Sequence, residues 1–178
     1  MTSYGGKELA TAFRTVRKNT IQVAQDIPEE KYTFVAAPEV RSVARMLTHI
    51  AISTRFWEEL DKKSLTTLVG FDFSGALERL NAEEAKLRSK SDILNLLQTE
   101  GERFAAWMET VTPEFLAGTV TEPDGKTQKS RFERLLGVKE HEMHHRAQLM
   151  LIERQLGIVP HLTRQFQERM AQMRAAKA

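Results

Sequence analysis

The 178-residue sequence contains no cysteine, which excludes disulfide bonds, thiolate metal ligands and a cysteine nucleophile. Any metal that the chain binds must therefore be held by nitrogen and oxygen atoms. An excess of one charge is also lacking, because 26 Lys and Arg residues nearly balance 24 Asp and Glu residues. The chain thus has no net field that would attract nucleic acid or an anionic membrane surface, and we expect neither as a partner.

Long hydrophobic runs are missing as well. No apolar stretch approaches the roughly 20 residues of a membrane helix, and residues 1–13 lack the basic-then-apolar pattern of a secretory signal. We therefore expect a soluble, cytoplasmic protein. Because 41% of the residues are hydrophobic, the chain can bury one continuous core, and we expect residues 1–178 to form a single domain.

Proline and glycine are scarce, with five and nine residues, and most of them separate segments whose apolar residues recur every three or four positions. This pattern predicts an all-α protein without a convincing strand pair. The fold we expect is an antiparallel four-helix bundle with long connections and a short C-terminal helix, in which residues 159–178 form an appendage. The long helices are expected at about residues 7–25, 42–61, 91–112 and 130–156, with Ser42, Ser91 and Ser130 as N-caps. Residues 64–90 are assigned to a loop with a short helical piece.

Three of the five histidines lie in a five-residue stretch, 141–145, inside the last of the expected long helices. At about 100° per residue, His141 and His145 project within roughly 40° of each other, one turn apart, so both imidazoles can reach one point. This spacing is typical of a metal-chelating pair. His144 belongs to a different stripe and is assigned no chemistry. The alternative is a pair of core histidines that hydrogen-bond to carboxylates, since unpartnered buried imidazoles would cost several kcal/mol.

His49 is the candidate for a third ligand, because it lies near the middle of the second expected helix, on the flank of its apolar face. If the second and fourth helices are neighbours, three imidazoles converge. Taken alone, such a histidine is more often a hydrogen-bonded core residue than a ligand, so this prediction depends on the fold. His161 is interpreted as a surface or loop residue.

The string HEMHH also satisfies the H-E-x-x-H pattern of zinc peptidases, with Glu142 as general base and Glu168 near the window for a third ligand. The extended pattern fails, because Gln148 replaces a glycine and Leu151 replaces the third histidine. Peptidase sites usually adjoin a sheet, which this sequence does not predict. We therefore favour a solvated or salt-bridged Glu142 beside Arg146, and a peptidase is the less favoured hypothesis.

The segments AAPEVRS, VRSVARMLTHIA and EHEMHHRAQLMLIERQLG together resemble the DinB-like (YfiT-like) four-helix bundle proteins, over roughly residues 9–160. The H-x-x-x-H-R-x-Q-L run is the most specific part, although Ala147 stands where the family often has glycine. The resemblance implies that a divalent metal is bound by His49, His141 and His145. Members with known roles include transferases that use low-molecular-weight thiols such as bacillithiol or mycothiol, and hydrolases, while many others have no assigned activity. The resemblance therefore implies the metal more specifically than the reaction.

Three neutral histidines leave a coordination position open, where water or a thiol can become a nucleophile. We therefore expect one divalent ion per chain, either zinc, nickel, iron, cobalt or manganese. The expected partner is a small-molecule substrate, with a low-molecular-weight thiol as one candidate. The alternative is a non-catalytic metal- or ligand-binding bundle. The sequence assigns no further catalytic acid or base. Finally, an apolar stripe in residues 162–175 predicts a homodimer; its members are Leu162, Phe166, Met170 and Met173.

Overall fold

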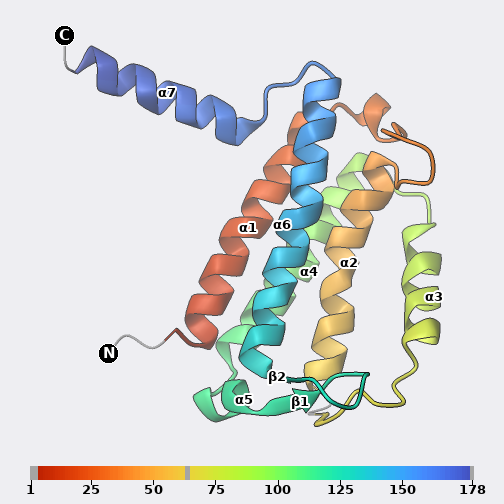
Figure 1. Cartoon of the computed structure of the whole chain (residues 1–178). Helices are drawn as coiled ribbons and strands as arrows, with labels where there is room; N and C mark the ends of the chain where they lie inside the picture. The colour runs from red at the N-terminus through yellow and green to blue at the C-terminus, as the bar shows by residue number, and fades with distance from the viewer. Residues whose placement is uncertain (1–3, 63–64, 177–178) are drawn as a thin grey trace.

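The computed structural model describes residues 4–62 and 65–176 and is mostly helical (Figure 1). Four long helices form a bundle, as predicted: α1 (Gly6–Asp26), α2 (Val43–Lys62), α4 (Lys90–Glu109) and α6 (Arg131–Gln155). The remaining elements are the 3-10 turn η1 (Glu29–Lys31), the helices α3 (Phe73–Glu84), α5 (Pro113–Ala117) and α7 (His161–Ala175), and two strands, β1 (Thr119–Thr121) and β2 (Gln128–Ser130).

The order of the helices around the bundle places α6 beside α2. Helix α1 packs against α4 and α6, and α2 packs against the same two helices. In Figure 1, α1 and α6 run upward while α2 and α4 run downward, and α3 returns the chain from the bottom to the top. The neighbours α2 and α4 therefore run parallel, whereas α2 and α6 run antiparallel. One apolar cluster joins the ends of α1 and α6 to the starts of α2 and α4, and a second fills the opposite end.

Two of the three predicted N-caps are found in the structure. Ser42 and Ser130 each accept a hydrogen bond from a backbone N–H in the first turn of the following helix. The third prediction is wrong, because α4 is capped by Ser89 and not by Ser91. Asp92 decides between them: it lies three positions after Ser89, and its carboxylate accepts a hydrogen bond from the Ser89 backbone N–H, which completes a reciprocal capping box.

The segment before α4 is more helical than predicted. Residues 73–84 form the 12-residue helix α3, which includes Gly75. Gly75 lies in the first turn, and its backbone N–H donates to the side chain of the N-cap residue Asp72 at 2.8 Å. A glycine in the first turn does not break the helix, because that turn's N–H groups have no partner within the helix in any case.

The prediction of no strand pair is also wrong in detail. Strands β1 and β2 form an antiparallel hairpin in which Val120 pairs with Lys129. The turn is built by Asp124, whose carboxylate accepts from two following backbone N–H groups, and by Gly125, whose φ is 68°. Strands of three residues are too short for an alternating pattern to appear in the sequence.

Helix α7 extends away from the bundle (Figure 1), and His161 is its only buried residue in the described part of the chain. His161 is therefore not the surface residue we expected: it is 3% exposed and donates from Nε2 to Asn19 Oδ1 at 3.1 Å. None of the described helices is long and apolar enough to cross a membrane.

Candidate metal centre

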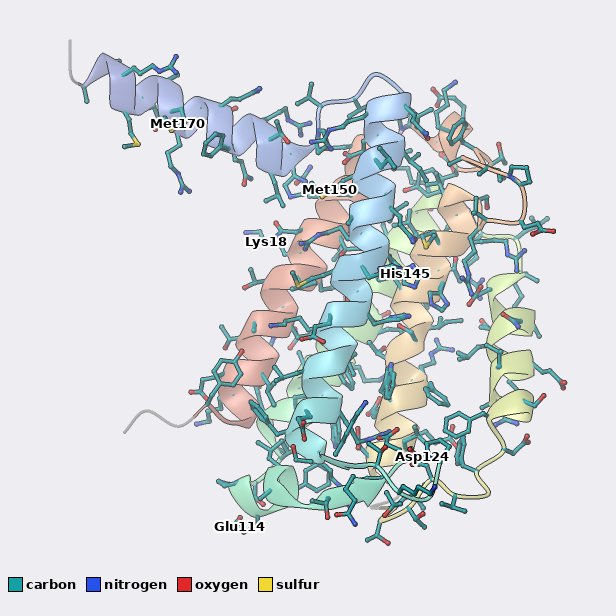
Figure 2. The ribbon with its side chains drawn as sticks, viewed as in Figure 1. Lys18, Glu114, Asp124, His145, Met150 and Met170 are labelled. Carbon is teal, nitrogen blue, oxygen red and sulfur yellow. The ribbon has the colours of Figure 1, made fainter. Side chains whose placement is uncertain are left out.

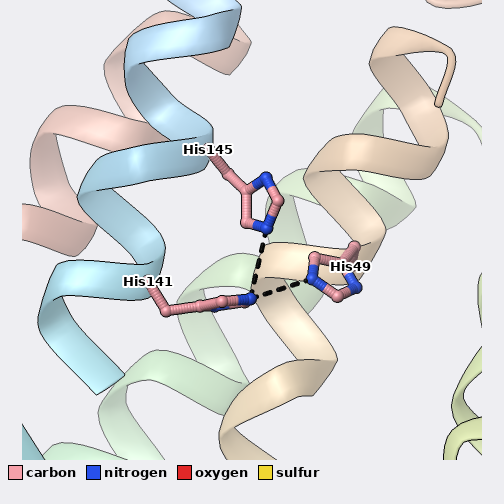
Figure 3. Close-up of side chains that lie close together, drawn as sticks. All are labelled: His49, His141 and His145. Carbon is pink, nitrogen blue, oxygen red and sulfur yellow. Dashed lines mark hydrogen bonds between the residues drawn. The ribbon is translucent and has the colours of Figure 1, made fainter. Parts of the chain in front are cut away.

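The structure brings His49 of α2 together with His141 and His145 of α6, and Figure 3 shows the three rings facing one another. The Nε2 atom of His141 lies 3.1 Å from Nε2 of His49 and 3.2 Å from Nε2 of His145. Within residues 4–62 and 65–176, this is the one group of three side chains whose possible ligand atoms all lie within 4.8 Å of one another. The packing of α2 against α6, on which the prediction for His49 depended, produces it.

The outer nitrogen of His49 is held by Glu84, the last residue of α3. His49 Nδ1 donates to Glu84 Oε1 at 2.5 Å, and Arg41 Nε donates to Glu84 Oε2 at 2.8 Å. Burial by itself would raise the pKa of Glu84, but the hydrogen bonds from His49 and Arg41 outweigh it and lower this pKa to about 2. Because a carboxylate only accepts, His49 carries its proton on Nδ1 and directs the Nε2 lone pair at the other two rings.

The outer nitrogen of His145 also has a partner. Nδ1 of His145 donates to Gln148 Oε1 at 3.1 Å, and the Gln148 amide donates to Nε2 of His144 at 3.2 Å. The Nε2 lone pair of His145 therefore also faces the cluster. His144 is exposed and lies outside the group of three, although the edge of its ring packs against His145, with the ring centroids 5.0 Å apart.

His141 is the central ring and has no satisfactory hydrogen-bonding state in the protein alone. Burial, together with the neighbouring imidazoles, lowers its pKa to about 4, and burial also lowers the pKa of His145. Both rings are thus neutral near pH 7. A neutral His141 has one N–H, so its Nε2 can donate to only one of the two lone pairs that face it. Its Nδ1 is buried without a partner. A cation shared by the three Nε2 atoms would remove the conflict.

The H-E-x-x-H residues do not form a peptidase site. The Glu142 carboxylate accepts from Arg17 Nε and Nη2, both at 3.0 Å, and both side chains are buried in the interface with α1. Glu142 is salt-bridged, as expected, but its partner is Arg17 of another helix, and it is not solvated. Glu168 is exposed on α7 and is no member of the histidine group. A glutamate held in this way cannot activate a water at the histidines.

A pocket of about 560 Å³ adjoins the histidines between the segment before α2 and helix α6, and His145 is part of its wall. Figure 2 shows His145 between α6 and α2. The histidines are half-buried, and they are not enclosed in the core. A small molecule can therefore reach the cluster from this side.

Reasoning from the sequence missed Glu84 and Arg41. Glu84 is 35 residues from His49 in the chain, and no spacing rule connects the two. Gln148 lies within the H-x-x-x-H-R-x-Q-L run, and its position one turn after His145 was a signal that could have identified it as the partner of that ring.

The geometry agrees with the comparison to known protein families. The model of the DinB superfamily matches residues 12–149, which is more than half of the chain. The chain belongs to the DinB superfamily. The resemblance that the histidine motif suggested is thereby confirmed.

Two solved structures show the fold that this DinB-superfamily chain shares. One is YfiT from Bacillus subtilis, described as a probable metal-dependent hydrolase with an unusual four-helix bundle topology (19% identity, TM-score 0.70, covering 89% of this chain and 91% of that one). The other is the DinB-like protein YjoA from Bacillus subtilis (21% identity, TM-score 0.62, covering 84% and 92%). At such identities the similarity establishes the fold alone. No curated protein matches the chain.

Proposed function

We propose that the chain binds one divalent metal ion through the Nε2 atoms of His49, His141 and His145, and that it acts on a small molecule as a hydrolase or a thiol-dependent S-transferase. The observation that carries this proposal is the orientation of the rings. Glu84 and Gln148 hold the outer nitrogens of His49 and His145, so that two lone pairs point at the nitrogen of a third ring.

The donor set fits such an ion. Three nitrogens bound to a tetrahedral ion at about 2.0–2.1 Å are separated by roughly 3.3 Å. The observed separations of 3.1 and 3.2 Å are close to this value. Neutral imidazoles suit zinc, nickel, iron, cobalt and manganese alike, and three of them leave a position for water or substrate.

When bound, such an ion supplies a Lewis acid that lowers the pKa of a coordinated water or thiol. The protein's own residues keep the rings in place and admit the substrate. Glu84 hydrogen-bonds to His49 alone of the three histidines, and its second oxygen is engaged by Arg41. Its role is therefore to position His49. The pocket beside His145 provides room for a small substrate.

Elemental analysis of the purified chain, after loading with zinc or nickel, tests the metal site. We expect about one ion per chain in the wild type and loss of tight binding in His141→Ala and His145→Ala. His144→Ala is the matched control, because this exposed neighbour on the same helix lies outside the group and should retain the metal. Sub-stoichiometric metal in the wild type, or an equal loss in His144→Ala, would contradict the proposal.

Turnover distinguishes the enzyme from a non-catalytic bundle. Ester and amide hydrolysis, and transfer of an electrophile to a low-molecular-weight thiol, should be measured with the metal-loaded chain and after chelation. Activity that chelation removes and added metal restores supports the enzyme. A metal-loaded chain without any turnover across such a panel would support the alternative of a metal- or ligand-binding bundle.

A further inference from the structure

We propose that the pocket beside His145 binds small organic acids with an apolar body, and that the guanidinium of Arg45 holds their carboxylate. The inference rests on the proposed function, since it names the class of substrate that would reach the histidines. It can nevertheless be tested separately, because the walls of the pocket are formed by the protein and not by the metal.

The size and walls of the pocket suit a small apolar body. Its volume of about 560 Å³ lies within the range of small-molecule sites. Met46 of α2 and Leu151 and Ile152 of α6 contribute apolar surface. Leu151 is a lining residue and is 59% exposed, so it offers a bound molecule apolar surface to cover.

Arg45 is the cation that the pocket leaves without a partner. Of the two arginines in the lining, Arg41 is engaged by Glu84. Within residues 4–62 and 65–176, no hydrogen bond or ion pair engages the exposed Arg45 guanidinium. A carboxylate entering the pocket would therefore pair with Arg45 without breaking an existing contact.

The backbone at the start of α2 cannot take over this role. The N–H of Val43 donates to Phe34 O, that of Ala44 donates to Tyr32 O, and that of Arg45 donates to Ser42 Oγ. Because these first-turn donors are already satisfied, recognition of an anion at this end of the pocket depends on a side chain. Arg45 is the side chain in place to provide it.

Glu39 limits the number of negative charges that the pocket accepts. It lies in the lining, on a turn closed by the hydrogen bond from Val40 N–H to Ala37 O, and it has a φ of 62°. This left-handed conformation is strained for a non-glycine residue, whereas glycine would adopt it without strain. The turn thus places a carboxylate at the pocket despite the strain. Its charge opposes a second anionic group, so monocarboxylic acids fit better than diacids.

The test uses three probes of nearly equal shape: phenylbutyrate, phenylbutyramide and phenylbutylamine. Calorimetric titration near neutral pH should be carried out with the metal-loaded chain and with the chelator-treated chain. We expect the acid to bind roughly tenfold more tightly than the amide in both forms, because one charge-assisted contact distinguishes them. Arg45→Gln should reduce the affinity for the acid to that for the amide and leave the amide unchanged.

Two further variants control for charge. Arg169→Gln removes the same charge from exposed α7, remote from the pocket, and should leave the preference for the acid intact. Glu39→Gln should reduce discrimination against phenylsuccinate, a diacid, by roughly two- to threefold. Circular dichroism would confirm that each variant is folded.

The outcomes separate this proposal from the proposed function. A chain that binds no metal but still prefers the acid through Arg45 refutes the metal site alone. Four results overturn the pocket proposal: equal affinity for acid and amide, tightest binding of the amine, a preference that survives Arg45→Gln, or no binding of any probe. A preference found only in the metal-loaded chain overturns it too, because the carboxylate would then bind the ion.

Discussion

Replacing Glu84 should weaken metal binding, although Glu84 is not itself a predicted ligand. Its side chain is fully buried, and it accepts from His49 Nδ1 at 2.5 Å and from Arg41 Nε at 2.8 Å. Partners of this kind fix the orientation of a metal-binding histidine and raise the basicity of its coordinating nitrogen. Their removal typically costs 10- to 100-fold in affinity, or about 1.4 to 2.8 kcal/mol.

Two substitutions at this position should give a graded result. Glu84→Gln keeps an oxygen that can accept from His49 but removes the charge, so we expect a loss of about tenfold. Glu84→Ala removes the acceptor and also leaves the Arg41 guanidinium unpaired near the cation site, so we expect about a hundredfold loss. Competition for zinc against a chromophoric chelator measures both affinities.

Glu83→Gln is the matched control. Glu83 precedes Glu84 on the same helix, but its carboxylate pairs with Lys86 and Arg88 and does not reach His49. Its substitution should leave zinc affinity unchanged. Wild-type affinity in a folded Glu84→Ala variant would refute the reasoning, and so would an equal loss in Glu83→Gln.

Two further predictions concern the C-terminal part of the chain. Burial, and then the charge of Asp26, raise the pKa of Glu153 from 4.5 to about 7. Protonation of Glu153 therefore contributes fully to the free energy of unfolding below pH 4.5, and this contribution is lost as the pH rises through 7. Urea unfolding at pH 5 and pH 8 should show that Glu153→Gln flattens this decline by up to about 3 kcal/mol, and an unchanged decline would contradict it. The homodimer predicted from the stripe on α7 should dissociate in a chain carrying Phe166→Gln and Met173→Gln, which replace exposed residues, while Leu87→Gln, an exposed control elsewhere, should remain dimeric. Light scattering that finds the same state in all three chains would exclude this role of the stripe.

The features that the sequence determined by itself are those governed by local geometry. Four positions separate His141 from His145, and a helix places such residues on one face, whatever the rest of the fold. The same regularity predicted the long helices and the caps Ser42 and Ser130. Shorter features were not predicted correctly. Three-residue strands show no period, and the choice of Ser89 as the cap depended on its reciprocal hydrogen bonds with Asp92.

The partners of these residues were decided by the path of the chain. His49 joins the pair only because α2 packs beside α6, and Glu84 reaches His49 only because α3 returns along the bundle. Arg17, which forms the salt bridge with Glu142, also comes from a helix that is far from α6 in the sequence. Contacts between residues far apart in the chain depend on how whole helices are placed, and no periodicity encodes them. The sequence by itself therefore determined which histidines share a face, whereas the tertiary structure decided which groups orient them and what can reach them.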